Sequence, residues 1–338
     1  MEKRKEIDFI NVLLCLLVML IHILSYSIST LDKTSVWYAA VLMPSRLASF
    51  VVQGFIFISA LKYSMRYCGK QNSGFKYPSF MKSRVKTVIA PYILWNIIFY
   101  LALIPLGYFI LSTGSIKAIC TYIVRGDMIS HFYFVVVIVQ FYLLMPLWLK
   151  LTDNFNGMML CVISMCIMVL FGRYASGFRY NDRIFLKYIF YWIWGCTAGR
   201  NYERFIHMLD KNKGKLLITF LIFAFADSFG LYINNTVGII PVMEYIHIAY
   251  CIFAIMLVFM LGIKFSGIVD KTVLSVVNRQ SYNIYLSHCL VLYYCNYLLN
   301  YFGIYSAKAM LLARFVLCYA VTLIFWSIYD AVKRKISC

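Results

Sequence analysis

The sequence has little charge, little proline and no linker-like stretch. Only 13% of its 338 residues are charged and six are proline. No serine-, glycine- or charge-rich run separates two parts of the chain, so the sequence predicts a single domain over residues 1–338 with no separate soluble domain. The hydrophobic fraction of 63% and the mean hydropathy of +0.78 predict an all-α, polytopic membrane protein.

Motifs typical of metal sites and of nucleotide phosphate binding are also absent from the sequence. The 11 cysteines form no CxxC pair and no Cys/His spacing of a metal site, so we interpret them as reduced, small apolar residues and expect no metal. Neither a GxxxxGK[ST] nor a GxGxxG phosphate loop occurs. Acidic residues number 13 against 32 Lys and Arg. That excess would suggest nucleic acid in a soluble protein, but in a membrane protein it marks cytoplasmic loops, so we expect no nucleic-acid partner.

Apolar windows predict about ten transmembrane helices. Their residue ranges are 7–29, 36–62, 86–112, 131–150, 155–172, 184–199, 215–233, 241–263, 281–300 and 307–332. Lys and Arg cluster before the first helix, in the second, sixth and eighth connections and after the last helix. All of these places fall on one side of the membrane, so both termini are predicted to be cytoplasmic.

One predicted outer connection departs from this charge rule. Arg173, Arg179, Arg183 and Lys187 lie between the fifth and sixth helices, with only Asp182 to offset them. Either the fifth helix is misplaced, or this outward basic patch binds an anionic group such as a lipid phosphate or an acidic glycan. The sequence leaves both interpretations open.

The first predicted helix carries a polar stripe. At 100° per residue, Asp8, Asn11, Cys15, His22 and Ser29 project within about 40° of one another. Polar groups that faced lipid would be unsatisfied, so the stripe is expected to face other helices or a wet cavity. His22 then either joins helices by hydrogen bonding or transfers protons, and both interpretations remain open.

Other polar residues lie within the predicted helices. Arg46 is placed near the middle of the membrane at about the height of His22, with an ion pair to Asp227 or Glu244 as the alternative interpretation. Arg314 is explained by snorkelling to the outer surface. His131 opens the fourth helix, with Gln140 deeper, and Ser281, Tyr285 and His288 share one face of the ninth; taken alone, both sets favour interhelical hydrogen bonds.

Five short sequence motifs follow one another along the chain. The first motif is an Asp, an Arg three residues later, and a His after ten further residues. Asp8 and His22 occupy the first and last of these positions, and Asn11 stands where the motif has Arg. Other stretches read VQGFIFISA (52–60), SRVKTVIAPY (83–92), HFYFVVVIVQFYLLMPL (131–147) and SYNIYLSHCLVL (281–292). Together they resemble acyltransferase family 3, membrane O-acyltransferases that modify bacterial surface glycans. The most similar branch is the short biofilm-polysaccharide type, which includes the intercellular adhesin O-succinyltransferase.

This resemblance implies transfer of an acetyl or succinyl group from cytoplasmic acyl-CoA to a hydroxyl of a cell-surface polysaccharide or its lipid-linked precursor. The protein would then lie in the bacterial cell membrane among lipids, with acyl-CoA as cosubstrate. Lys82, Arg84 and Lys86 are expected to neutralise the CoA phosphates. His22 is expected to act as the general base, with a covalent acyl-histidine as the alternative.

Stabilisation of the oxyanion falls to Arg46 or His288, because Asn11 lies about 16 Å below His22 along the helix. The remaining residues expected to bind substrate or to support the site are Asp8, Asn11, His131, Gln140, Ser281, Tyr285, Arg173 and Arg179. A polysaccharide exporter or flippase is the alternative function, since helices with 28 Tyr and 27 Phe could line a sugar path. A membrane sensor or partner subunit without chemistry is a third. The oligomeric state is left open.

Overall fold

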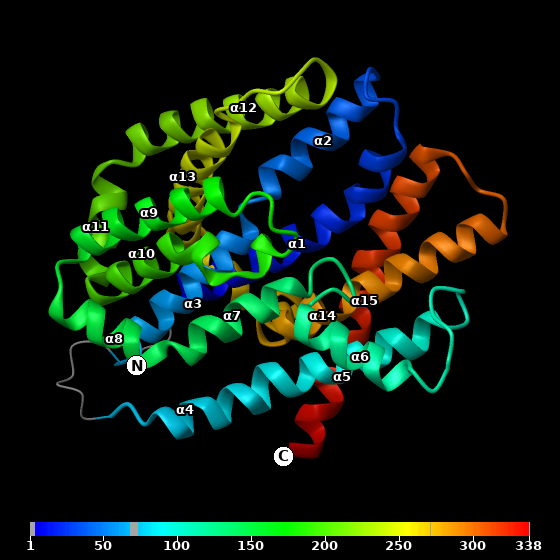
Figure 1. Cartoon of the computed structure of the whole chain (residues 1–338), viewed down its shortest axis with the longest axis horizontal. Helices are drawn as coiled ribbons and strands as arrows, with labels where there is room; N and C mark the ends of the chain where they lie inside the picture. The colour runs from blue at the N-terminus through cyan, green and yellow to red at the C-terminus, as the bar shows by residue number, and fades with distance from the viewer. Residues whose placement is uncertain (1–3, 68–73, 271, 338) are drawn as a thin grey trace. The chain divides into compact units, whose positions relative to one another are not determined.

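The computed structural model describes residues 4–67, 74–270 and 272–337, and every regular element in these ranges is a helix (Figure 1). The α-helices are α1 (Lys5–Thr30), α2 (Val36–Ala48), α3 (Val51–Tyr67), α4 (Tyr77–Arg84), α5 (Ala90–Leu103), α6 (Ser115–Arg125), α7 (Tyr133–Leu143), α8 (Met145–Asn154), α9 (Gly157–Tyr174), α10 (Ile189–Arg200), α11 (Tyr202–Lys211), α12 (Lys213–Thr236), α13 (Met243–Phe265), α14 (Thr272–Tyr301) and α15 (Ala307–Ser337). A π-helix, η1 (Val85–Ile89), joins α4 to α5, and η2 (Asn181–Arg183), η3 (Phe185–Tyr188) and η4 (Ser266–Asp270) are 3₁₀ turns. The predicted all-α class is confirmed.

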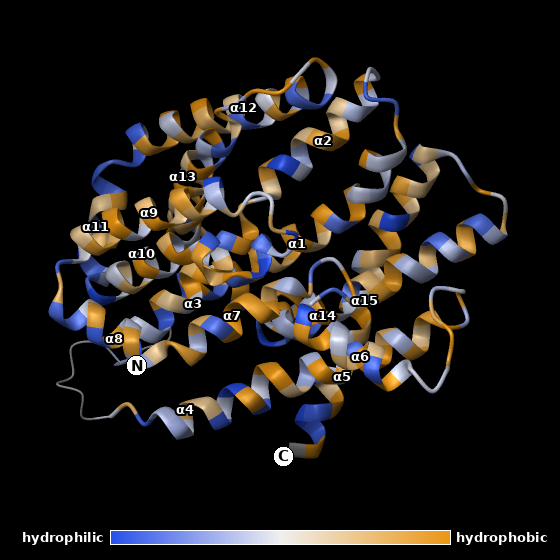
Figure 2. Cartoon of the chain, in the orientation of Figure 1, coloured by the Kyte–Doolittle hydropathy of each residue, from blue (hydrophilic) through white to orange (hydrophobic). Residues whose placement is uncertain are grey.

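Seven helices of the described chain are long and apolar enough to cross a membrane, and an eighth span is added if the bent α7–α8 pair crosses as one. Figure 2 shows the hydrophobic residues along these helices. The protein is therefore a multi-pass membrane protein. The prediction of ten spans also counted residues 184–199, which hold the 12-residue α10, and residues 281–300, which lie within α14. Ten spans and cytoplasmic termini stay predictions.

Several predicted helices are broken in the structure. The predicted 36–62 helix lies within one candidate span, Val36–Tyr67, in which a turn at Ser49 and Phe50 separates α2 from α3. The predicted 131–150 helix bends by 58° between α7 and α8. Pro146 stands at the start of α8 and lacks the N–H that a continuous helix would need. The predicted 86–112 helix ends at Leu103, close to a turn in which Gly107 has φ +79°. Only glycine adopts that backbone conformation readily.

The chain divides into two units, which we call the inserted unit (residues 52–206) and the split unit (residues 2–51 with 207–338). In the split unit α1 packs against α2, α13, α14 and α15. Leu14, Met19 and Ile23 of α1 are fully buried in this packing. The split unit therefore surrounds the helix that carries His22.

Close helix packing in the inserted unit depends on two glycines of α10. A Cβ added at Gly195 would overlap the Phe57 carbonyl of α3, and one at Gly199 would lie 2.5 Å from the Leu61 carbonyl oxygen. The Ser64 hydroxyl of α3 also donates a 2.6 Å hydrogen bond to the Cys196 carbonyl. Glycines spaced by four residues allow such backbone approach between membrane helices.

We expect Gly195→Ala to lower the free energy of unfolding by about 1–3 kcal/mol, because the added methyl group must push backbone apart. Denaturation in mixed detergent micelles would measure the loss. Gly214→Ala in α12 is the matched control, since nothing lies within 4 Å of a Cβ added there. Equal stability of the two variants would contradict the close-packing argument.

Candidate active site

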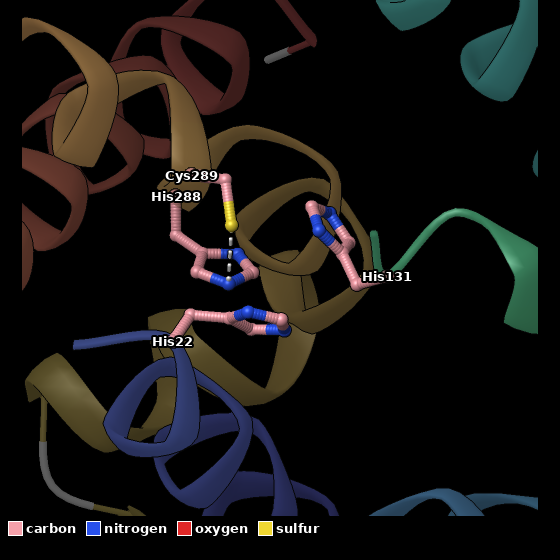
Figure 3. A group of neighbouring side chains, drawn as sticks. All are labelled: His22, His131, His288 and Cys289. Atoms are coloured by element: carbon pink, nitrogen blue, oxygen red, sulfur yellow. Dashed lines mark hydrogen bonds between the residues drawn. The ribbon is translucent and has the colours of Figure 1, made fainter. Parts of the chain in front are cut away.

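His22 of α1 lies beside His288 of α14 in the split unit (Figure 3). The two ring centroids are 5.2 Å apart and the ring planes are inclined by 50°. His288 is fully buried, whereas His22 is partly exposed. The structure thus brings two of the three predicted catalytic residues together, and His22 is the less buried of the two.

The polar stripe of α1 faces α14 along much of its length. The Asn11 amide donates to Asn278 Oδ1 at 2.8 Å and to the Ser281 hydroxyl at 3.0 Å. The Cys15 thiol donates to the Ser281 carbonyl at 3.6 Å. The expectation that the stripe faces other helices is therefore confirmed at Asn11, Cys15 and His22. Asn11 joins two helices by neutral hydrogen bonds, as interhelical amides often do in membranes.

Backbone carbonyls fix the tautomer of His288. Nδ1 lies 3.1 Å from the Ile284 oxygen and 2.9 Å from the Tyr285 oxygen. A carbonyl oxygen only accepts, so Nδ1 carries the proton and the neutral ring has its lone pair on Nε2. The Cys289 sulfur lies 3.4 Å from Nε2 and donates to it (Figure 3). His288 therefore becomes a donor at Nε2 only after it takes up a proton.

Arg314 of α15 holds the backbone around His22, a contact that the sequence did not reveal. Its side chain donates to the His22 carbonyl at 2.5 Å, to the Ile23 carbonyl at 3.0 Å and to Asn296 Oδ1 at 2.6 Å. Arg314 is only 3% exposed. The snorkelling interpretation is wrong, because the guanidinium turns inward to these acceptors. The carbonyls supply the hydrogen bonds that a buried cation requires.

Three further predicted site residues of the split unit are Ser281, Tyr285 and Asp8. The Ser281 hydroxyl accepts a hydrogen bond from the Asn11 amide. The Tyr285 carbonyl accepts one from His288 Nδ1, and the Tyr285 ring centroid lies 6.5 Å from that of His288. Asp8 lies in the first turn of α1 and is partly buried. Supporting roles for these residues stay predictions.

Arg46 forms an internal ion pair within the split unit. Arg46 Nε lies 2.7 Å from Asp227 Oδ2, and Arg46 Nη2 lies 2.8 Å from Asp227 Oδ1, so the guanidinium contacts both carboxylate oxygens. His247 Nδ1 lies 3.1 Å from Oδ2 of the same fully buried carboxylate. The alternative interpretation of Arg46 as one half of an ion pair with Asp227 is confirmed. Its role as an oxyanion donor stays a prediction.

The predicted CoA-binding residues lie in the inserted unit, around the junction of α4 and η1. The Arg84 guanidinium donates to the Tyr63 hydroxyl at 2.6 Å and lies 5.5 Å from the ring centroids of both Tyr63 and Phe80. Lys82 and Lys86 are exposed. Arg84 is therefore engaged in internal cation–π contacts, whereas the two lysines reach the surface.

Gln140 of α7 holds the connection that follows α9. Its amide donates to the Arg183 carbonyl at 2.6 Å and its oxygen accepts from the Phe185 N–H at 3.1 Å. The interhelical hydrogen bonding expected for Gln140 is confirmed as a contact to η2 and η3. His131 precedes α7, is buried and packs edge-on against Phe132.

Two residues of the predicted outward basic patch, Arg179 and Arg183, lie around a tyrosine of the inserted unit together with Arg125. Arg125, Arg179 and Arg183 lie 4.8–5.7 Å from the Tyr180 ring centroid. Arg173 lies in the last turn of α9, whose range of Gly157–Tyr174 agrees with the predicted 155–172 within two residues. The fifth helix is therefore not misplaced, and binding of an anionic group by the patch stays a prediction.

Known proteins resemble the chain in two ways, through a family model and through named relatives. The family model described as an acyltransferase domain, that of acyltransferase family 3, matches residues 4–330. The chain is 25% identical over 315 residues to a probable poly-beta-1,6-N-acetyl-D-glucosamine export protein of Staphylococcus aureus strain Mu50, covering 86% of this chain and 82% of that protein. A protein of the same name in strain MRSA252 is 24% identical over 314 residues, with the same coverage of both chains. No solved structure matches the chain significantly.

The family match extends over both units, and the split unit holds the histidine of the first helix beside a second imidazole. Together with the apolar spans, this match decides the class of the protein. The chain belongs to acyltransferase family 3 and is a membrane acyltransferase.

Proposed function

We propose that this enzyme moves an acetyl or succinyl group from cytoplasmic acyl-CoA to a hydroxyl of a cell-surface polysaccharide or its lipid-linked precursor in the bacterial cell membrane. The observation that carries the proposal is the pair of His22 and His288 within a membrane acyltransferase. A sugar hydroxyl is a poor nucleophile until a base removes its proton, and a neutral imidazole suits that task. The glycan as acceptor is supported by the names of the staphylococcal relatives.

His22 is the proposed general base because it is the accessible member of the pair. It takes the hydroxyl proton as the oxygen attacks the acyl carbonyl, and Arg314 keeps the backbone of His22 in place. His288 can stabilise the oxyanion of a tetrahedral intermediate only while its Nε2 carries a proton. Geometry favours His288 over Arg46 for this role, because the Arg46 guanidinium is bound to Asp227.

The exposed Lys82 and Lys86 are proposed to bind the CoA phosphates as point charges. Arg84 lies between them in the sequence and is held by aromatic rings, which supports a role in shaping this surface. Arg173 and Arg179 belong to the basic patch that is proposed to bind an anionic part of the acceptor or a lipid phosphate.

Purified protein in liposomes, given radiolabelled acetyl-CoA or succinyl-CoA and a β-1,6-linked N-acetylglucosamine oligosaccharide, tests the proposal. Label recovered on the oligosaccharide as an alkali-labile ester is the expected result. Mass spectrometry of surface glycans from cells with and without the gene then identifies the acyl group. Glycans of identical mass, together with no transfer in liposomes, would refute the proposed function.

Export of a polysaccharide is the second candidate, favoured by the name of the staphylococcal relatives. The same liposomes distinguish the two functions if the oligosaccharide is placed inside and its release is measured. Release without acyl-CoA and without label on the sugar favours transport. Label on the sugar favours the acyltransferase.

A further inference from the structure

We propose that Cys289 carries the acyl group as a thioester between CoA and the acceptor. The proposal rests on the proposed function and adds a covalent intermediate to it. It concerns three side chains of the split unit, His22, His288 and Cys289, which we call the thiol–imidazole cluster (Figure 3). One ring nitrogen of each histidine and the Cys289 sulfur lie within 4.8 Å of one another.

His288 is arranged as a base for the Cys289 thiol. Its Nδ1 proton is committed to the Ile284 and Tyr285 carbonyls, which leaves the Nε2 lone pair 3.4 Å from the Cys289 sulfur. A thiol becomes a strong nucleophile when a neighbouring base takes its proton. This arrangement of nucleophile, base and orienting group is the one that covalent acyl transfer requires.

His22 supplies what the second half of the reaction requires. Its ring lies 5.2 Å from that of His288, so an acyl group on Cys289 would sit next to a second, independent base. The partial exposure of His22 provides a side from which an acceptor hydroxyl can approach. The two imidazoles then have separate tasks, one for the thiol and one for the hydroxyl.

The first step exchanges one thioester for another. The Cys289 proton passes to His288 Nε2, the sulfur attacks the acyl carbonyl of acyl-CoA, and a new carbon–sulfur bond forms. The carbon–sulfur bond to CoA breaks, and the departing CoA thiolate takes the proton from His288. No oxidant, reductant or further reactant is needed.

The second step forms the oxygen ester. The acceptor hydroxyl attacks the acyl-Cys289 carbonyl while its proton passes to His22, and the bond from carbon to the Cys289 sulfur breaks. The cysteine thiolate recovers the proton from His22. The sum is acyl-CoA plus alcohol giving ester plus CoA, and CoA leaves before the acceptor reacts, which predicts ping-pong kinetics.

Another thiol–imidazole contact in the split unit offers a control. The Cys251 sulfur lies 3.5 Å from Nε2 of His247, close to the 3.4 Å at Cys289. His247, however, binds Asp227, whose charge is already paired with Arg46. None of the three residues of the thiol–imidazole cluster takes part in this contact, so Cys251→Ala tests whether a thiol beside an imidazole is sufficient.

The experiment incubates the full-length protein in nanodiscs with radiolabelled acetyl-CoA and no acceptor, followed by acid quench and peptide mapping. We expect label on Cys289 that neutral hydroxylamine releases. Cys289→Ala should abolish the label and lower transfer to the oligosaccharide by on the order of 10³-fold, whereas Cys251→Ala should match the wild type. His22→Ala should still accept label but fail to pass it on.

Wild-type transfer rates in Cys289→Ala, or label mapped to any other residue, would overturn the carrier proposal while the proposed function stood. A stoichiometric metal ion that is lost in Cys289→Ala would also overturn it. A wild-type protein that neither takes up label nor transfers it defeats the proposed function and the carrier proposal together. Cys289→Ser, with unchanged elution and melting temperature, excludes misfolding as the cause of any loss.

Discussion

Alanine at position 22 is expected to lower acyl transfer by about 10²–10⁴-fold, the range that a positioned general base contributes. The His22 ring lies 5.2 Å from His288, and a methyl group cannot take the acceptor proton. The protein should still fold, because Arg314 binds the backbone carbonyls of residues 22 and 23, which alanine retains. Initial rates with radiolabelled acyl-CoA and the oligosaccharide acceptor measure the effect.

A histidine outside the cluster provides the matched control. His207 of α11 is exposed, and His207→Ala should leave the rate within a factor of two or so, as surface substitutions generally do. His22→Gln keeps hydrogen-bonding capacity but cannot act as a base, so it should resemble His22→Ala. Full activity in His22→Gln would assign His22 to helix packing, the interpretation that competes with catalysis.

Loss of the Asp227 charge is expected to lower the free energy of unfolding by about 3–5 kcal/mol, because it leaves the Arg46 cation without a counter-charge among the helices. Asp227 is fully buried and holds Arg46 through two contacts of 2.7 and 2.8 Å. Asp227→Asn keeps the volume and removes the charge. Denaturation in mixed detergent micelles gives the free-energy difference.

The double variant Arg46→Met with Asp227→Leu should be more stable than either single variant, because no unpaired charge remains. An exposed pair, Lys213 with Asp210, is the control, and Asp210→Asn should change stability by only about 0–1 kcal/mol. Equal losses at Asp210 and Asp227 would contradict the ion-pair argument. Acyl transfer by the folded double variant also tests Arg46 as an oxyanion donor, since that role predicts a loss of rate.

Much of the fold could be predicted because apolar length is a local property of the sequence. The ranges of α1, α9 and α13 agree with the predicted windows within two residues at each end. Breaks were harder to predict, since α2 and α3 lie in one apolar run and divide without a proline at the junction. The amphipathic α6 and α11 were missed because neither helix is apolar enough to resemble a span.

The candidate site was predictable in part for a related reason. Helical periodicity gives the face on which His22 lies, and the structure confirms that this face meets α14. Helical periodicity does not indicate which distant helix supplies the partner of each residue on that face. Arg314 was therefore assigned to the membrane surface, although it binds the His22 carbonyl, and Cys289 was interpreted as one small apolar residue among many.

Arg314 and His22 are separated by 292 residues, and the whole inserted unit is synthesised between them. At about 5–20 residues per second, a ribosome needs roughly 15–60 s to span that interval. α2 is made directly after α1, but α14 and α15, which contact the polar stripe and the His22 carbonyl, are made last, so until then water, lipid headgroups or the insertion machinery must satisfy that stripe. Assembly of the reactive centre is thus a late, post-insertional event in the biogenesis of this protein.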